Sequence, residues 1–279
     1  SLSVDSGQQP TYSKRVVASL VVCQFGLHAC LNGMRVALPL KSLDLGYSVF
    51  TVGLIVALFA LMPALFAISF GRMTDRRGFF LPIHMAALIA IVAVIPLTLS
   101  DSRLALCLGA AGSGAGAGFG MIAVQRYASQ IASNSTIRIK IFSWITLAPA
   151  TAGLVGASVT GLLIDGYGYA IAFAALAMFP LLTLVFAHGV PDRKPATDPK
   201  HGASNRKKIM ELLRLPALRR LLFVNWVVAL SWDAHGFVIP ILGHERGFSA
   251  SEVGGVFASF SLAAIIVRLI IPFISGKLS

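Results

Sequence analysis

Four polar side chains recur along one apolar stretch near the start of the chain. Gln24, His28, Asn32 and Arg35 are separated by four, four and three residues, which places them on one face of a helix. Because polar side chains are costly inside a membrane, each is a candidate functional group. The row ends in an arginine, and it predicts contact with a solute or a gate. Interhelical hydrogen bonding and, for Arg35, snorkelling to the membrane surface are the alternatives.

A second polar group occurs late in the chain and consists of Asn225, Trp232, Asp233 and His235. Asp233 is the only carboxylate well inside an apolar stretch, and an isolated ionised aspartate there is so costly that it must be protonated or paired. We therefore predict that Asp233 is a proton-coupling site, with Arg35 or His28 as its partner across a cavity. A purely structural pair is the alternative.

Arg268 lies seven residues after Ser261 on the same predicted helix face. It is either a second cationic contact for a solute or a residue that snorkels to the membrane surface. Two arginines at one cavity would suit an anionic solute, whereas Asp233 and the nearby aromatic rings would suit cations or neutral amphiphiles. The pattern leaves the class of solute open.

The composition predicts that these residues lie on membrane-spanning helices. Hydrophobic residues make up 56% of the chain and charged residues 12%, with a mean hydropathy of +0.81, whereas soluble domains carry about 25% charged residues. Eight apolar stretches approach the ~20 residues that a helix needs to cross a bilayer. They cover residues 16–39, 49–70, 80–100, 104–125, 141–164, 169–188, 218–242 and 251–274. The expected fold is an all-α, polytopic transmembrane helical bundle.

The net charge of +12 is spread along the chain rather than gathered on a soluble domain, which argues against a nucleic-acid partner. If the amino terminus is cytoplasmic, the outer loops hold only Lys41, Arg103 and Arg246, and the remaining basic loop residues face the cytoplasm. This is the positive-inside pattern. We expect a multi-pass protein of a cell membrane, specifically a bacterial cytoplasmic membrane, with its amino terminus inside.

Four regions follow from the polar and apolar segments. We expect a cytoplasmic tail at 1–15, a six-helix half at 16–190, a basic cytoplasmic linker at 191–217, and the first two helices of a second half at 218–279. Residues 206–215 of the linker mix basic and apolar side chains, which favours either a short helix on the membrane surface or a solvated segment. Six spans before the linker imply six after it, so we expect eight of twelve spans here and a longer protein.

An internal repeat supports this division into halves. An offset of 201 residues aligns 24–67 with 225–268 without a gap, and it pairs Pro39 with Pro240, Gly46 with Gly247, and Ser48 with Ser249. Transporters are often built from two such halves related by an axis along the membrane normal.

The stretch after the second predicted span carries a spaced motif of Gly71, Asp75, Arg76 and Gly78. It resembles the loop signature of the major facilitator superfamily, and Gly276-Lys-Leu-Ser279 resembles the start of the same signature in a second half. The resemblance implies that this motif helps to hold one conformational state. Gly71 would let the helix end approach its neighbour, and Asp75 would offer its carboxylate to a helix amino terminus or to a guanidinium.

Two stretches depart from the family's pattern. The fourth span lacks a buried arginine ahead of a Gln-Gly pair, because Arg103 is at its outer end. In the fifth span, Gly156-Ala-Ser-Val-Thr-Gly161 lacks the proline of proton-driven exporters. These two departures argue against the exporter subclass, and they do not affect the loop motif that carries the resemblance to the family.

The remaining residues predict packing rather than chemistry. The fourth span repeats glycine at positions 109, 112, 114, 116, 118 and 120, and such small residues let membrane helices approach closely. Cys23, Cys30 and Cys107 lie inside spans and are expected to pack there. No catalytic set, metal ligand set or cofactor motif occurs, so we do not expect an enzyme.

The resemblance implies a secondary active transporter that works by alternating access, a permease for a small molecule. Proton-coupled export of a small amphiphilic molecule is our first prediction, and uptake of an organic anion through Arg35 is the alternative. A non-transporting, truncated membrane protein is an alternative of another class. The expected partners are the lipid bilayer, the solute and protons, with no metal or cofactor, and the full-length protein is expected to be a monomer.

Overall fold

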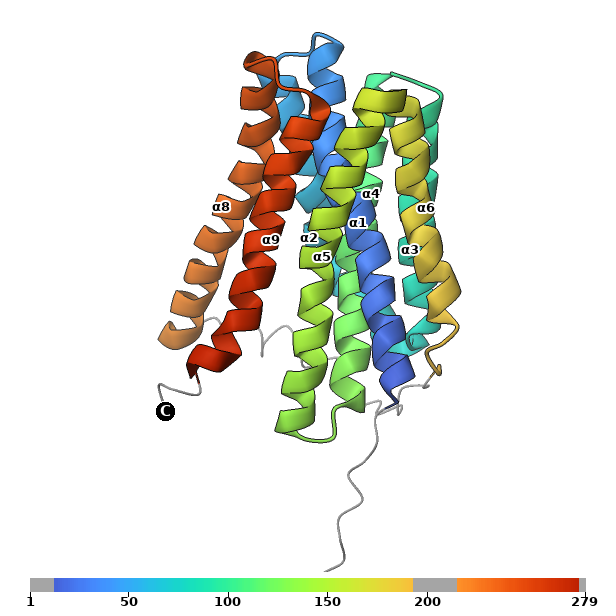
Figure 1. The fold of residues 1–279 in the computed structure, drawn as a ribbon. Coiled ribbons are helices and arrows are strands. Elements are labelled where there is room, and N and C mark those ends of the chain that lie inside the picture. The colour runs from blue at the N-terminus through green and yellow to red at the C-terminus, as the bar shows by residue number, and fades with distance from the viewer. Residues whose placement is uncertain (1–12, 193–214, 276–279) are drawn as a thin grey trace, which may run out of the picture.

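The computed structural model describes residues 13–192 and 215–275, and every regular element in these ranges is helical (Figure 1). The elements are α1 (Lys14–Asp44), α2 (Val49–Arg77), α3 (Phe80–Val94), η1 (Ile95–Thr98), α4 (Arg103–Ile131), α5 (Ser135–Tyr167), α6 (Tyr169–Ala187), α8 (Pro216–Glu245) and α9 (Ala250–Ser275). The all-α prediction is confirmed. Residues 206–214 of the predicted surface helix at 206–215, and the motif-like end at 276–279, lie outside the described residues.

Eight helices in the described ranges are long and apolar enough to cross a membrane, α3 and η1 counting as one. Several extend beyond the predicted apolar spans. Polar side chains fix three of the helix starts: Ser48, Ser102 and Asn134 accept hydrogen bonds from backbone N–H groups of the first turns of α2, α4 and α5, as N-cap residues do.

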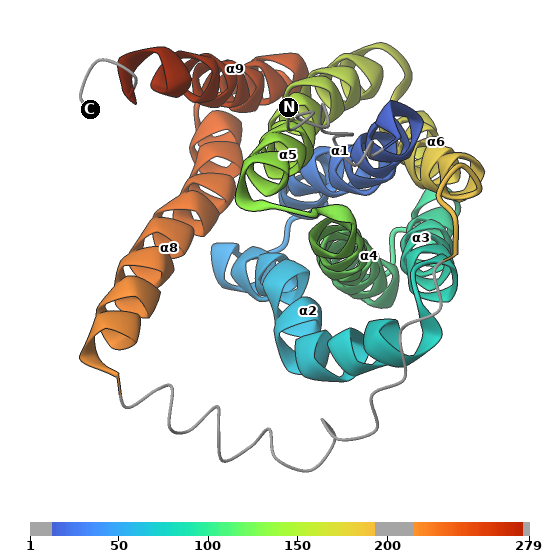
Figure 2. The ribbon, with the colours of Figure 1, turned by 90° about the horizontal axis from the view of Figure 1, so that it is seen from below.

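The helices run roughly along one axis, with α4 lying between α1, α2 and α3 (Figures 1 and 2). Seen along this axis, α3 and α6 lie on one side of the bundle, and α8 and α9 lie on the other (Figure 2). Leu27 of α1, Ile83 of α3 and Ile141 of α5 are buried together in the core.

Glycines of α4 allow this central position, as the sequence predicts. A Cβ atom at Gly116 would lie 2.8 Å from both the carbonyl oxygen of Ala86 and the Cβ of Ala90 on α3. A Cβ atom at Gly118 would lie 2.5 Å from the Cβ of Pro63 on α2. Larger side chains at these positions would push α4 away from both neighbours.

The turns between α1 and α2 and between α8 and α9 have the same structure. Gly46 has a φ of 78° and Gly247 a φ of 71°, a left-handed conformation that glycine adopts without strain. Ser48 and Ser249 each accept a hydrogen bond from the N–H three residues later. The internal repeat therefore extends to backbone geometry.

The two ends of the bundle differ in charge. We call one end the basic end, because Arg72, Arg76, Arg77, Arg138 and Lys140 lie there, and the other the opposite end. The part of α8 near the opposite end packs against the bundle, with Gly236, Pro240, Ile241 and Gly243 buried. Residues 216–232 of α8, toward the basic end, are exposed apart from Leu218, and this part leans away from the other helices (Figure 2).

Candidate functional site

An ion pair joins α1 to α8 inside the membrane-spanning region. The Arg35 Nη2 atom lies 3.0 Å from Oδ1 of Asp233. Of the two partners predicted for Asp233, the structure therefore selects Arg35. The pair is unequally buried, since the side chain of Arg35 is 18% exposed and that of Asp233 is 48% exposed. The guanidinium also lies over the ring of Phe59 on α2, 5.9 Å from its centroid.

The other three polar residues of α1 bond mainly along their own helix. His28 Nδ1 lies 3.1 Å from the carbonyl oxygen of Gln24, and Asn32 Nδ2 donates to the carbonyl oxygen of His28 at 2.8 Å. Gln24 is buried, and its Oε1 atom has no hydrogen-bond partner within residues 13–192 and 215–275. The predicted row therefore exists, and its last two members, Asn32 and Arg35, line the two cavities described below.

Trp232 and His235 bring an aromatic cluster to the other side of the pair. The Trp232 ring lies 5.0 Å from that of Phe260 on α9, and the His235 ring stacks on Phe260 at 4.6 Å. His235 also contacts the edge of Phe257 at 5.2 Å. Its Nε2 atom is buried and has no hydrogen-bond partner among the described residues.

Two small cavities flank the Arg35–Asp233 pair. The first, of about 20 Å³, is bounded by residues of α1, α5, α8 and α9, including Asn32, Trp232 and His235. The second, of about 80 Å³, lies between α1, α2 and α8, and its lining apart from the ion pair is apolar: Val56, Ala57, Phe59, Ala60 and Gly236. Arg35 lines both the polar, aromatic cavity and the apolar one, whereas Asp233 lines the apolar one.

Two of the predicted pathway residues lie elsewhere. Asn225 is on the exposed part of α8 and lines neither cavity. Arg268 is also exposed, and its guanidinium donates to the backbone carbonyl of Thr146 on α5. Ser261 does line the first cavity, so the predicted shared face of Ser261 and Arg268 does not place both at the site. Both side chains face α5, where Ser261 lies against Gly153 and Arg268 against Thr146. Arg268 lies outside the cavity because it is seven residues, or about 10 Å, further along α9 toward the basic end.

The loop motif forms a second polar site at the basic end. Asp75 pairs with the guanidinium of Arg126 on α4. Of the two partners expected for Asp75, a helix amino terminus or a guanidinium, the structure has the guanidinium. Gly78 has a φ of 78° and ends α2, and Arg76 is exposed. The close approach expected at Gly71 is not seen in this structure, because no atom of another described helix lies within 4 Å of a Cβ placed there. The helix end is not in close contact at Gly71.

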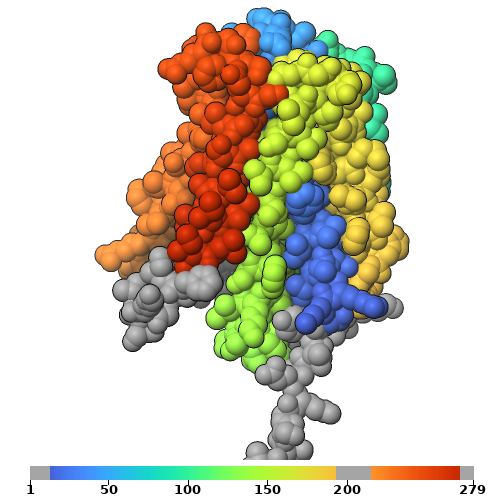
Figure 3. All heavy atoms as spheres, viewed as in Figure 1, coloured from blue at the N-terminus to red at the C-terminus, as the bar shows by residue number. Residues whose placement is uncertain are grey.

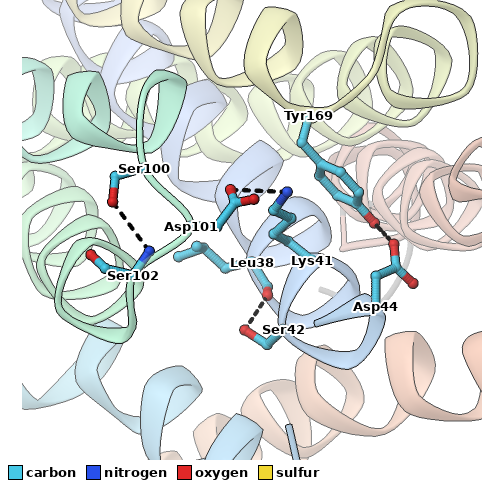
Figure 4. A network of polar contacts seen from close by, with 8 residues as sticks. All are labelled: Leu38, Lys41, Ser42, Asp44, Ser100, Asp101, Ser102 and Tyr169. Atoms are coloured by element: carbon cyan, nitrogen blue, oxygen red, sulfur yellow. Dashed lines mark hydrogen bonds and ion pairs between the residues drawn. The ribbon is translucent and has the colours of Figure 1, made fainter. Parts of the chain in front are cut away.

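The opposite end carries polar contacts that the sequence did not reveal. The Tyr169 hydroxyl of α6 donates to Asp44 of α1 at 2.5 Å, and His244 Nε2 of α8 lies 3.2 Å from the same carboxylate. Lys41 pairs with Asp101 at 3.0 Å beside them (Figure 4). Asp44 therefore connects α1 to both α6 and α8.

Asp165 of α5 makes a second connection at this end. Its carboxylate accepts hydrogen bonds from the backbone N–H groups of Ala250 at 3.0 Å and Ser251 at 2.8 Å. These groups begin α9, where free N–H groups and the helix dipole favour an anion. The only signal in the sequence was an aspartate near the end of a span, and nothing identified its partner.

Among the described residues, no group of three or more His, Cys, Asp or Glu side chains is placed to hold a metal ion. Cys23, Cys30 and Cys107 are free thiols. The polar residues of the site thus form hydrogen bonds and one ion pair, and they are not arranged as the ligands of a metal ion.

Comparisons with known proteins agree with the fold. A POT family transporter solved in complex with thioalcohol conjugated peptide has 18% identity and a TM-score of 0.56, over 81% of this chain and 50% of that chain. A POT family transporter in complex with 5-aminolevulinic acid has 18% identity and a TM-score of 0.56, over 82% of this chain and 50% of the other. At this identity the similarity shows the fold alone, and the chain spans about half the length of these structures.

No curated protein matched the chain in a sequence search. The family model of the Major Facilitator Superfamily matches residues 20–279. That range includes every described helix except the first six residues of α1. The chain is therefore a multi-pass membrane protein that belongs to the Major Facilitator Superfamily.

Proposed function

We propose that this chain is part of a secondary active transporter that moves a small solute by alternating access, coupled to protons through Asp233. The observation that carries the proposal is the Arg35–Asp233 ion pair between α1 and α8. Asp233 lies twelve residues before the end of α8, or about 18 Å along the helix axis. An ionisable residue at that depth is a functional candidate by default.

The proton acts on the contact between the two helices. Protonation of Asp233 removes its charge and weakens the bond to Arg35, so that α8 is free to move relative to α1. A hydrogen bond between charged groups contributes about 1.5–3 kcal/mol, which corresponds to a change of roughly 10- to 100-fold in an equilibrium. Because Asp233 is half exposed, we expect the lower part of this range.

The packing of the two ends supports a rocking motion. The contacts of Asp44 with His244 and of Asp165 with α9 hold the helices together at the opposite end. At the basic end, the exposed part of α8 leans away from α2. We interpret this arrangement as the state closed at the opposite end and open at the basic end, with the ion pair between the two.

The test uses the full-length protein in proteoliposomes that contain a pH-sensitive dye. Small carboxylates, amines and neutral amphiphiles are added in turn to the wild type, to Asp233→Asn and to Glu245→Gln. Glu245→Gln is the matched control, because it removes a carboxylate from the exposed end of the same helix.

We expect solute-dependent proton movement in the wild type and in Glu245→Gln, and its loss in Asp233→Asn. The Asn variant should still exchange labelled solute across the membrane, since exchange needs no net proton movement. Equal proton-coupled accumulation in Asp233→Asn and the wild type would show that Asp233 is structural. Failure of any solute to move in the wild type would remove the transport proposal.

A further inference from the structure

The two members of the Arg35–Asp233 pair differ in how easily each can lose its partner. Arg35 is the more buried member, with a side chain that is 18% exposed, whereas the side chain of Asp233 is 48% exposed. A buried charge without a counter-charge is far more costly than an exposed one. The exchangeable member is therefore Asp233, and whatever replaces it must bring a negative charge to Arg35.

We infer that the solute is a small monocarboxylate with an apolar body, whose carboxylate replaces that of Asp233 on Arg35. This inference rests on the proposed transport function and names its class of solute. A cationic solute would have to displace Arg35 from Asp233, and the guanidinium would then remain buried and unpaired. The unequal burial of the pair thus resolves the conflict between the arginine and the aspartate in favour of an anion.

Arg35 is held ready for this exchange by a contact that does not involve Asp233. Its guanidinium lies over the Phe59 ring, and Phe59 is itself buried at 3% exposed. A guanidinium within about 6 Å of an aromatic ring is attracted to the face of that ring, and this contact does not depend on Asp233. The guanidinium stays in place when the aspartate leaves, and its N–H groups match both oxygens of a carboxylate.

The lining and volume of the apolar cavity indicate the polarity and size of the rest of the solute. Besides the ion pair, its lining consists of Val56, Ala57, Phe59, Ala60 and Gly236, without a polar side chain. Its volume of about 80 Å³ limits the body of the solute to a short branched chain or a single ring. A solute with its carboxylate on Arg35 would place that body against α2.

Charge balance links the carboxylate to the proton. When one proton neutralises Asp233 and one monocarboxylate binds Arg35, the site gains a positive and a negative charge together. The net charge of the pair is the same before and after binding, so neither partner is left as an uncompensated ion. The inference therefore includes a stoichiometry of one proton per carboxylate.

The test uses benzoate and benzylamine, which share a ring and differ in the sign of their charge. Binding to the purified full-length protein is measured by titration calorimetry in buffers with different ionisation enthalpies, which gives the protons taken up per ligand bound. We expect benzoate to bind with an uptake close to one proton, and at least tenfold more tightly than benzylamine. The wild-type measurement needs no variant, so a folding defect cannot obscure it.

Variants then assign the contacts. Arg35→Lys should weaken benzoate at least tenfold because the paired N–H geometry is lost, whereas Arg103→Lys, at the exposed start of α4, should change nothing. Asp233→Asn should bind benzoate without proton uptake. Ala57→Leu, which fills the apolar cavity, should weaken benzoate more than acetate.

Benzylamine binding as tightly as benzoate, or benzoate binding without proton uptake in the wild type, would overturn the inference. These results are distinct from failure of the proposed function. If another solute drives protons through Asp233 in proteoliposomes while benzoate does not bind, the transport proposal stands and the monocarboxylate is wrong. If benzoate binds with one proton but no solute is transported, the site is correct and the transport proposal is wrong.

Discussion

Replacing Asp165 by alanine should open the opposite end of the bundle. Asp165 is the residue of α5 whose carboxylate accepts the backbone N–H groups of Ala250 and Ser251. The substitution leaves both N–H groups at the start of α9 without this acceptor and removes a favourable charge from the helix terminus. It deletes no buried volume, because Asp165 is exposed, so the packing of α5 should not change.

The size of the effect follows from the two bonds. Removal of a side-chain cap costs about 0.5–2 kcal/mol, and hydrogen bonds to a charged group contribute about 1.5–3 kcal/mol. Exposure to water brings the total toward the lower values, and we expect about 1–2 kcal/mol, or a 5- to 30-fold change in the ratio of closed to open states. Asp165→Asn keeps one acceptor oxygen and should show roughly half of this free energy.

The assay is the distance distribution between spin labels at Gly166 on α5 and Glu245 on α8, which are both exposed at this end. Asp165→Ala should increase the population with the longer distance. Asp101→Ala is the control, because it removes an exposed carboxylate at the same end whose ion pair is with Lys41 of α1. An unchanged distribution in Asp165→Ala, or an equal change in Asp101→Ala, would refute the reasoning.

Two further predictions concern packing and capping. Gly156→Val should lower the melting temperature in detergent, because its Cβ would collide with the backbone of Ala29 and overpacking typically costs about 1–3 kcal/mol. Gly255→Val is the control and should leave the melting temperature unchanged, because no atom of another described helix lies within 4 Å of a Cβ placed there. Equal melting temperatures of the two variants would contradict this reasoning. Asn134→Ala should cost about 1 kcal/mol by removing the N-cap of α5, seen as faster hydrogen exchange in its first turn, and unchanged exchange there would disprove the role.

Composition and local pattern were sufficient to predict most of the fold. Eight apolar stretches became eight helices because backbone groups within a bilayer must bond inside their own segment. The turn at Gly46 and its repeat at Gly247 were recognisable because a left-handed residue favours glycine. Helix ends were less predictable, since polar residues extend α1 to Asp44 and α2 to Arg77 beyond the apolar spans.

The candidate site was predictable only in part. The cost of an unpaired aspartate in a membrane required a partner for Asp233, but the choice between Arg35 and His28 depended on the orientation of α8, which no local pattern reports. The contacts of Asp44 and Asp165 were missed for a similar reason. Their partners are distant in sequence, and only the packing of α6, α8 and α9 brings them together.

The wrong expectations share a cause. Gly71 and Asn225 were assigned to contacts from their type and position on a helix. In the structure Asn225 is exposed, and no atom of a neighbouring described helix lies within 4 Å of a Cβ placed at Gly71. A residue type limits which contacts are possible. Which of them form depends on how neighbouring helices lie in the state observed.

The contact between α5 and α9, visible on one face of the molecule (Figure 3), is made largely of residues with little or no side chain. Gly161 faces the backbone of Ala250, Gly254 faces Ala157, and Gly153 faces the hydroxyl of Ser261. Large side chains that interlock would have to change rotamer before two helices could slide. Two helix surfaces without interlocking side chains need no such step. The contact between α5 and α9 therefore allows the two helices to move past each other with a low energy barrier.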